Sequence, residues 1–223
     1  MGPTDARADA AASRALIVGL GGLVLVASGY LFGAWIMSRG DLPFTVDSWW
    51  DQLVAQWWLP FLGGLARVMN WLGGGWFASF ALPILAAGAL IGIKRLWSAV
   101  YFLAAELASV IVVQVLKHVF ERVRPEDMLV VSDEGSYPSG HVANAATIAV
   151  AAVVLFPRVW VAIVAGAWVL MMAFSRTYLH AHWLSDTLGG VLVGSGVALI
   201  VAAAFWVPIA RERALPVSFS VRL

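Results

Sequence analysis

Long apolar stretches alternate with short polar ones along most of the chain. Six of these stretches approach or exceed the length of about 20 residues that a membrane-spanning helix needs. They cover residues 15–37, 75–93, 97–116, 141–156, 159–174 and 187–207. The fourth and fifth are short, and Pro157 ends the fourth. The pattern predicts an all-α fold, a bundle of six transmembrane helices.

The segment 44–74, between the first and second predicted spans, has a different pattern. Apolar residues such as Trp50, Val54 and Phe61 recur there at helical spacing among polar residues. This spacing places them on one face of a helix, and Pro60 should kink or split that helix. We expect one or two amphipathic helices lying on the outer membrane surface. They are either a gate for a lipid substrate or a plain connector.

Composition supports a membrane protein. The chain is 61% hydrophobic and only 12% charged, and it contains no cysteine. Its mean hydropathy is +0.86. These values exclude a disordered chain, a basic nucleic-acid-binding domain and an ordinary cytosolic enzyme. The absence of cysteine excludes disulfides, thiolate metal sites and cysteine nucleophiles. Residues 1–223 contain no long linker, which predicts one integral-membrane domain.

The charges outside the spans predict an orientation. With six spans, both termini and the loops after the second and fourth spans share one side. That side carries eight basic residues against three acids, and the other side carries six against nine. Basic loops stay in the cytoplasm. We therefore expect a multi-pass protein of the plasma (inner) membrane, with cytoplasmic termini and outward loops after spans one, three and five.

Polar side chains concentrate in two of these outward loops. Lys117, Arg124 and Arg176 are cations at the ends of apolar spans. Together they would repel one another unless an anion with several acceptor oxygens, such as a phosphate, lay between them. Ser139 and Gly140 stand at the start of the fourth span, where free backbone N–H groups suit the same anion.

Three further side chains in these loops can carry out chemistry. His182 and Asp186 are four residues apart, so on a helical turn they share a face. A carboxylate bonded to one imidazole nitrogen makes the other a better nucleophile. His141 is a second imidazole and can donate a proton near neutral pH. Any one of these residues alone would be a membrane anchor or a solvated side chain; together they supply every part of one reaction.

Three spaced motifs carry a family resemblance. The pattern Lys-x6-Arg-Pro, then Pro-Ser-Gly-His, then Ser-Arg-x5-His-x3-Asp resembles the type 2 phosphatidic acid phosphatase superfamily. The motifs span residues 117–186 and are met by Lys117, Arg124, Pro125, Pro138, Ser139, Gly140, His141, Ser175, Arg176, His182 and Asp186. The chain resembles the minimal bacterial members of this family.

The resemblance implies a metal-independent phosphatase with a phosphohistidine intermediate and no cofactor. His182 would be the nucleophile, Asp186 would orient it, and His141 would protonate the leaving oxygen. The phosphoryl oxygens would be held by Lys117, Arg124, Ser139, Gly140 and Arg176. The resemblance implies water and a membrane lipid phosphate as partners, and it implies no binding of a nucleic acid.

The substrate is left open between lipid classes. We favour an undecaprenyl-type polyprenyl diphosphate, with phosphatidylglycerophosphate or phosphatidic acid as the alternative. A member of another class, a non-catalytic lipid-phosphate-binding or transport protein, would lack one of the motif residues or show more polar residues inside its spans.

Several polar residues near the motifs have no assigned part. Glu106 lies eleven residues before Lys117 in the third span, so the two should share a helix face. It either packs against a neighbouring helix or bonds beneath the site. We expect His118, His180 and the acids of the outer loop, including Asp133, to be solvated.

Overall fold

The structure is a computed structural model that describes residues 3–133 and 135–214. Glu134, one of the loop acids, and the C-terminal residues 215–223, including Arg222, lie outside the described residues. The described part of the chain is helical and contains no strand, so the all-α prediction is confirmed. Its elements are α1 (Pro3–Ser38), α2 (Thr45–Gln56), α3 (Pro60–Gly73), the π-helix η1 (Phe77–Ala81), α4 (Leu82–Gly92), α5 (Leu96–Phe120), α6 (Gly140–Leu155), α7 (Val159–Tyr178), α8 (Leu184–Ala204) and α9 (Trp206–Ala214).

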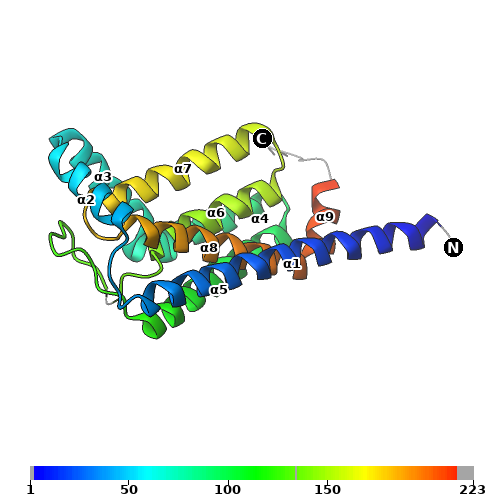
Figure 1. The fold of residues 1–223 in the computed structure, drawn as a ribbon. Helices are drawn as coiled ribbons and strands as arrows, with labels where there is room; N and C mark the ends of the chain where they lie inside the picture. Colours follow the sequence, from blue (N-terminus) through cyan, green and yellow to red (C-terminus); the bar gives the residue numbers. More distant parts are fainter. Residues whose placement is uncertain (1–2, 134, 215–223) are drawn as a thin grey trace, which may run out of the picture.

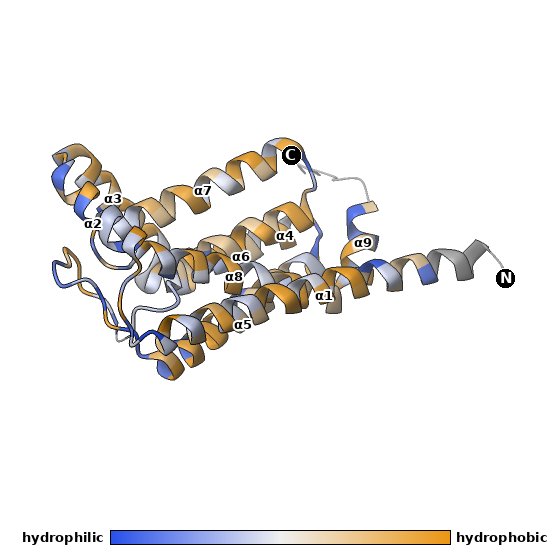
Figure 2. Cartoon of the chain, viewed as in Figure 1, coloured by the Kyte–Doolittle hydropathy of each residue, from blue (hydrophilic) through white to orange (hydrophobic). Residues whose placement is uncertain are grey.

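The long helices run alongside one another as a bundle (Figure 1). The short helices α2 and α3 lie at one end with the loop between α5 and α6, and α9 lies at the other end (Figure 1). Large apolar side chains face outward along the bundle, among them Ile17, Leu107 and Ile163, which are 69%, 63% and 66% exposed. Hydrophobic residues cover the helices along their length, and hydrophilic residues gather at the two ends (Figure 2).

The lengths and composition of the described helices do not confirm the expected six spans. Within residues 3–133 and 135–214, four helices are long and apolar enough to cross a membrane: residues Asp9–Ser38 of α1, and α5, α7 and α8. The pair Pro60–Gly73 and Phe77–Gly92, bent by 45°, makes a fifth if the pair is one span. Helix α6 has 16 residues, a length of only about 24 Å, against about 30 Å of bilayer core. Six spans are therefore not confirmed.

The segment 44–74 forms two helices, α2 and α3, as the sequence allows. They separate just before Pro60, which is the first residue of α3. Proline suits that position because its missing N–H has no helical partner there anyway. The described geometry does not place these helices on a membrane surface, so their interfacial position stays a prediction.

Close contact between helices builds the scaffold around α8. A Cβ added at Gly22 of α1 would lie 2.7 Å from the carbonyl oxygen of Gly196 in α8. The two backbones can approach this closely only because both positions are glycine, a common device between membrane helices. This close α1–α8 contact holds the middle of α8 against α1.

The helices also extend further than the apolar stretches predicted. Lys117 lies in the last helical turn of α5, Arg176 in that of α7, and Asp186 in the first turn of α8. All three were expected in loops, because their polarity ends each apolar stretch. Burial in the bundle allows the helices to continue through them. The connections that remain are residues 121–139 and 179–183.

Candidate active site

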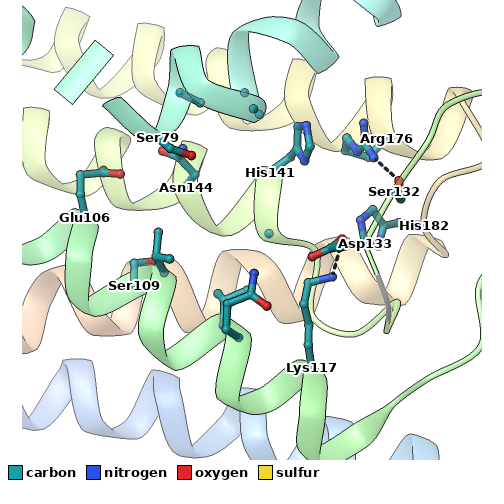
Figure 3. A pocket seen from close by; sticks show the side chains of 18 of the residues that line it. Ser79, Glu106, Ser109, Lys117, Ser132, Asp133, His141, Asn144, Arg176 and His182 are labelled. Atoms are coloured by element: carbon teal, nitrogen blue, oxygen red, sulfur yellow. Dashed lines mark hydrogen bonds and ion pairs between the residues drawn. The ribbon is translucent and has the colours of Figure 1, made fainter. Parts of the chain in front are cut away.

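One cavity of about 320 Å³ brings together residues from most of the bundle. Five of the predicted site residues line it: Lys117, Gly140, His141, Arg176 and His182. They come from α5, α6, α7 and the connection that precedes α8, and they surround one end of the cavity (Figure 3). Arg124, Ser139 and Asp186 are not part of this lining; Arg124 and Asp186 lie beside His182.

Buried cations form this end of the cavity. Lys117 and Arg176 are 3% and 1% exposed, although both are charged. Lys117 Nζ donates to the carbonyl oxygen of Gly135 at 2.7 Å, and Arg124 Nη2 donates to the same oxygen at 2.9 Å. Fixed cations held this far from water attract an anion strongly, because the low dielectric constant of the interior strengthens electrostatic interactions.

The carboxylate of Asp133 lies between two of these cations. Asp133 Oδ1 is 3.3 Å from Lys117 Nζ and 2.9 Å from Arg124 Nη2. Burial alone would raise the pKa of Asp133, but Lys117 and Arg124 outweigh it, and the pKa is lowered. Our expectation of a solvated Asp133 is therefore wrong in part: the side chain is 55% exposed but ion-paired. Its oxygens show that this arrangement of cations accepts an anion.

His182 is buried beside these cations and is held neutral. Its Nε2 lies 3.3 Å from Arg124 Nη1. Burial, and then the nearby charges of Arg176, Arg124 and Lys117, lower the pKa of His182 well below its ordinary value of 6.5. A neutral imidazole has one unprotonated nitrogen, which a nucleophile needs; it is Nε2 here, because Arg124 Nη1 can only donate to it.

Asp186 faces His182 but does not hydrogen-bond to it. His182 Nδ1 lies 3.6 Å from Asp186 Oδ2, longer than a hydrogen bond, and has no other partner among the described residues. Asp186 Oδ2 instead accepts from the Trp183 N–H at 2.8 Å and from the Ser136 hydroxyl. As predicted, the Asp186 carboxylate lies next to the His182 imidazole, but the two are too far apart to form a hydrogen bond.

Arg122 holds Asp186 in place, and the sequence analysis assigned it no part. Arg122 Nη1 lies 2.6 Å from Asp186 Oδ1, and Nη2 lies 3.2 Å from Asp47 Oδ2. All three side chains are fully buried. Asp47 also accepts from the Ser185 N–H at 2.8 Å. Arg122 therefore ties α2, α8 and the loop after α5 together. The one sequence feature that could have identified Arg122 is its position, because it is a cation two residues before Arg124 of the motif.

His141 lies in the first turn of α6, and a second residue missed by the sequence analysis faces it. His141 Nε2 is 3.1 Å from the carbonyl oxygen of Asn70 in α3, and Arg176 Nη1 donates to the Asn70 side-chain oxygen. Gly73 and Gly74, at the end of α3, leave no room for a Cβ beside Met172 and the His141 ring. The segment 44–74 therefore contributes directly to the site.

Ser139 and Gly140 form the start of α6. The Ser139 N–H donates to the Asp186 carbonyl oxygen at 3.1 Å, and the buried Ser139 hydroxyl has no partner among the described residues. A Cβ at Gly140 would lie 3.9 Å from Lys117 Cε, which is an ordinary contact. The helix start thus lies against the cation, and the free hydroxyl can donate to an anion bound there.

The other end of the cavity is polar as well. Glu106, Ser109, Asn144 and Ser79 lie around it (Figure 3). Glu106 is 7% exposed, and its Oε1 and the Asn144 Oδ1 have no partner among the described residues. Glu106 and Lys117 line the same cavity, so they share a face of α5 as predicted. Glu106 faces this space rather than bonding to another helix.

The surroundings of His118 and His180, the two histidines outside the motifs, differ from each other. His118 is exposed near the helix end, where Nδ1 lies 2.7 Å from the Gln114 carbonyl oxygen. His180 is 5% exposed, and its Nδ1 lies 2.6 Å from Asp51 Oδ1. The expectation of a solvated His180 is wrong, because α2 covers this connection and supplies the carboxylate.

Comparisons with known proteins agree on one family. The family model described as the PAP2 superfamily matches residues 98–209. Phosphatidylglycerophosphatase B of Bacillus subtilis is 32% identical over 148 residues, which are 60% of this chain and 71% of that protein. The undecaprenyl-diphosphatase of Sulfolobus acidocaldarius is 34% identical over 65 residues, 29% of this chain and 31% of that protein.

Two crystal structures resemble the fold. The transmembrane PAP2 type phosphatidylglycerolphosphate phosphatase from Bacillus subtilis has a TM-score of 0.69 at 25% identity, over 81% of this chain and 93% of that one. Aquifex aeolicus LpxE has a TM-score of 0.62 at 23% identity, over 71% and 95%. Together with the apolar helices, the likeness to a transmembrane phosphatase identifies a membrane protein.

Proposed function

The chain belongs to the PAP2 superfamily and is a phosphatase of the PAP2 type, and from this premise we propose that it hydrolyses a lipid phosphate through a phosphohistidine at His182. The observation that carries the proposal is the convergence of two imidazoles and the buried cations on one cavity. No step needs a metal ion or a cofactor.

The first step transfers the phosphoryl group to the enzyme. His182 Nε2 attacks phosphorus in line, the P–N bond forms and the P–O bond to the leaving alcohol breaks. Lys117, Arg124, Arg176, the Ser139 hydroxyl and the N–H groups of the helix start around Gly140 stabilise the charge on the phosphoryl oxygens. Asp186 stabilises the imidazolium that forms, once the 3.6 Å gap to Nδ1 closes.

His141 supplies the proton for the leaving oxygen. Its Nε2–H donates to the Asn70 carbonyl oxygen at 3.1 Å, so the step uses His141 as the imidazolium, with the transferable proton on Nδ1. The negative charge of the bound phosphoryl group favours that protonated form. In the second step, water attacks phosphorus, the P–N bond breaks and His141 takes the proton from the water. Both steps balance in protons, and His182 ends neutral, as it began.

For the substrate, we propose a lipid whose phosphorylated headgroup carries a free hydroxyl, as phosphatidylglycerophosphate does. The polar end of the cavity supports this choice, because Glu106 and Asn144 offer acceptor oxygens with no partner among the described residues. Phosphatidylglycerophosphatase B, which covers the larger share of this chain, is named for that substrate. A polyprenyl diphosphate, our first choice from the sequence and the substrate named in the other relative, stays the second candidate.

One experiment tests both activity and substrate. The purified protein, in detergent with a chelator, is offered phosphatidylglycerophosphate, phosphatidic acid and undecaprenyl diphosphate, and phosphate release is measured. We expect release without metal, and its loss in His182→Ala. Glu106→Leu should lower the preference for phosphatidylglycerophosphate roughly tenfold, the value of a typical hydrogen bond, whereas Glu106→Gln keeps an acceptor and the preference. Wild-type release by His182→Ala would refute the mechanism, and an unchanged preference in Glu106→Leu would refute only the substrate assignment.

We also propose six membrane crossings, with α2 and α3 at the outer surface, the termini in the cytoplasm and the active site facing outward across the plasma membrane. The basic excess on the opposite side supports this orientation. Because the chain has no cysteine, single cysteines report on it cleanly. A membrane-impermeant maleimide should label Glu126→Cys in intact cells and Lys94→Cys only after lysis, and the reverse pattern would overturn the orientation.

A further inference from the structure

A second charged cavity lies at the opposite end of the bundle from the candidate active site. It has a volume of about 460 Å³, and four arginines line it: Arg14, Arg95, Arg158 and Arg213. They come from α1, the α4–α5 connection, the α6–α7 connection and α9, and no acidic residue shares the lining. Four elements that are distant in sequence thus each bring one cation to the same space.

Arg95 is fixed in place by the fold and Arg213 is half-buried, whereas Arg14 and Arg158 are exposed. Arg95 is only 8% exposed; its Nη1 donates to the Leu155 carbonyl oxygen at 3.4 Å, and its guanidinium lies 5.1 Å from the centre of the Phe156 ring. Burial, and then the charge of Arg95, lower the pKa of Arg213. The shift agrees with two like charges held close together.

The nearest acid on α9 is occupied elsewhere. Glu212 accepts from the N–H groups of Trp97 and Ser98 at 2.6 and 2.9 Å and from the Ser98 hydroxyl at 2.7 Å, at the start of α5. This contact attaches α9 to the bundle and positions Arg213. Within residues 3–133 and 135–214, no ion pair neutralises any of the four arginines. A phosphate would do so, because guanidinium groups match its oxygens in paired hydrogen bonds.

An apolar groove adjoins the arginine cavity. It has a volume of about 870 Å³, lies between η1, α4, α6 and α7 with Leu72 of α3 in its lining, and shares Arg95, Phe156 and Arg158 with the cavity. Its other walls are apolar, with Ile148 and Trp168 among them. A free phosphate would use the arginines and leave the groove empty. A phospholipid would fill both.

We propose that this end of the bundle binds an anionic phospholipid, with its phosphate among the four arginines and one acyl chain in the groove. Basic pockets between membrane helices commonly hold anionic headgroups in this way. The arginine cavity shares no lining residue with the catalytic cavity: His141 lies at the start of α6 and Leu155 at its end, fourteen residues or about 21 Å apart. The proposal does not depend on the phosphatase chemistry.

The test measures lipid binding to the purified full chain by thermal shift and by native mass spectrometry. Phosphatidylglycerol should raise Tm with increasing concentration, because it binds the folded state alone, whereas phosphatidylcholine and inorganic phosphate should not. The double variant Arg158→Gln/Arg213→Gln should bind phosphatidylglycerol roughly tenfold more weakly or worse, given the strength of hydrogen bonds to charged groups. Arg211→Gln, at an exposed arginine of the same helix outside the cavity, should bind like wild type.

Two more variants separate the parts of the site. Arg158→Lys/Arg213→Lys keeps the charge and should recover part of the affinity, which guards against a glutamine variant that fails to fold. Ala165→Trp fills the groove and should weaken binding without a change of charge. His182→Ala should keep the shift; its loss there would place the lipid in the catalytic cavity and overturn the proposal. Equal binding by wild type and the glutamine variant, or an equal shift from inorganic phosphate, would also overturn it.

Discussion

Replacing Arg122 by glutamine tests how the candidate active site is held together. Arg122 contributes the guanidinium that bridges two fully buried carboxylates, Asp47 and Asp186. Glutamine keeps much of the volume and a hydrogen-bond donor but removes the charge. Both carboxylates then stay buried without their cation. Each keeps other donors: the Ser136 hydroxyl and Trp183 N–H for Asp186, and the Phe44 and Ser185 N–H groups for Asp47.

The size of the effect follows from this geometry. Removing one partner of a buried ion pair costs about 3–5 kcal/mol of unfolding free energy. Because the remaining donors partly compensate, we expect the lower end, about 3 kcal/mol. For a chain of this length, each kcal/mol lowers Tm by roughly 2–4 °C, so Tm should fall by roughly 6–12 °C. The double variant Arg122→Gln/Asp47→Asn should lose less than the sum of the two single losses, because the residues are in contact.

Activity separates positioning from stability. With Asp186 less firmly held, its carboxylate no longer closes the 3.6 Å gap to His182 Nδ1 as the imidazolium forms, and a displacement of about 1 Å costs roughly 100-fold in rate. We expect kcat to fall with little change in KM, measured well below the variant's Tm. The matched control is Arg67→Gln, an exposed arginine of α3, which should change neither value. A full kcat in folded Arg122→Gln would refute the positioning role, and a Tm equal to that of the control would refute the buried bridge.

Two further predictions concern charges around His182. Asp133→Asn removes the carboxylate that lies between Lys117 and Arg124, so inorganic phosphate should inhibit the enzyme a few-fold more tightly. The effect is modest because the ion pair is half-exposed. An unchanged inhibition constant would show that Asp133 does not compete with phosphate for these cations. Burial and then the nearby cations lower the pKa of His182 below 6.5, so its neutral, nucleophilic form persists as pH falls through 6.5. The fall in kcat/KM that accompanies protonation of His182, the His182 limb of the pH profile, should therefore lie below pH 6.5. Arg124→Gln removes one of those cations and should move the limb upward; a limb above pH 6.5 in wild type would contradict this reasoning.

The sequence predicted the scaffold and most of the site because both depend on local patterns. Apolar runs identified the main helices, and three motifs identified residues that meet at one cavity, such as Lys117 and His182. Helix ends were predicted less well. Polarity ends an apolar stretch at Lys117 or Arg176, yet tertiary burial carries the helix through both residues.

The supporting contacts could not be read from the sequence because they join residues that are far apart. Asp47 and Arg122 are 75 positions apart, and Asn70 and His141 are 71. Nothing local marks Asp47 or Asn70 as buried partners of the motifs. Both lie in segment 44–74, for which the sequence left a lipid gate and a plain connector equally open. The structure gives this segment a role in supporting the site.

The central claim is that His182 becomes covalently phosphorylated. The direct measurement is a rapid alkaline quench of the enzyme turning over a lipid phosphate, followed by peptide mapping by mass spectrometry, since phosphohistidine survives base and decays in acid. The account predicts a phosphoryl group on the peptide that contains His182, lost on acid treatment and absent from His182→Ala. A phosphoryl group on another residue, or turnover by His182→Ala at the wild-type rate, would contradict it.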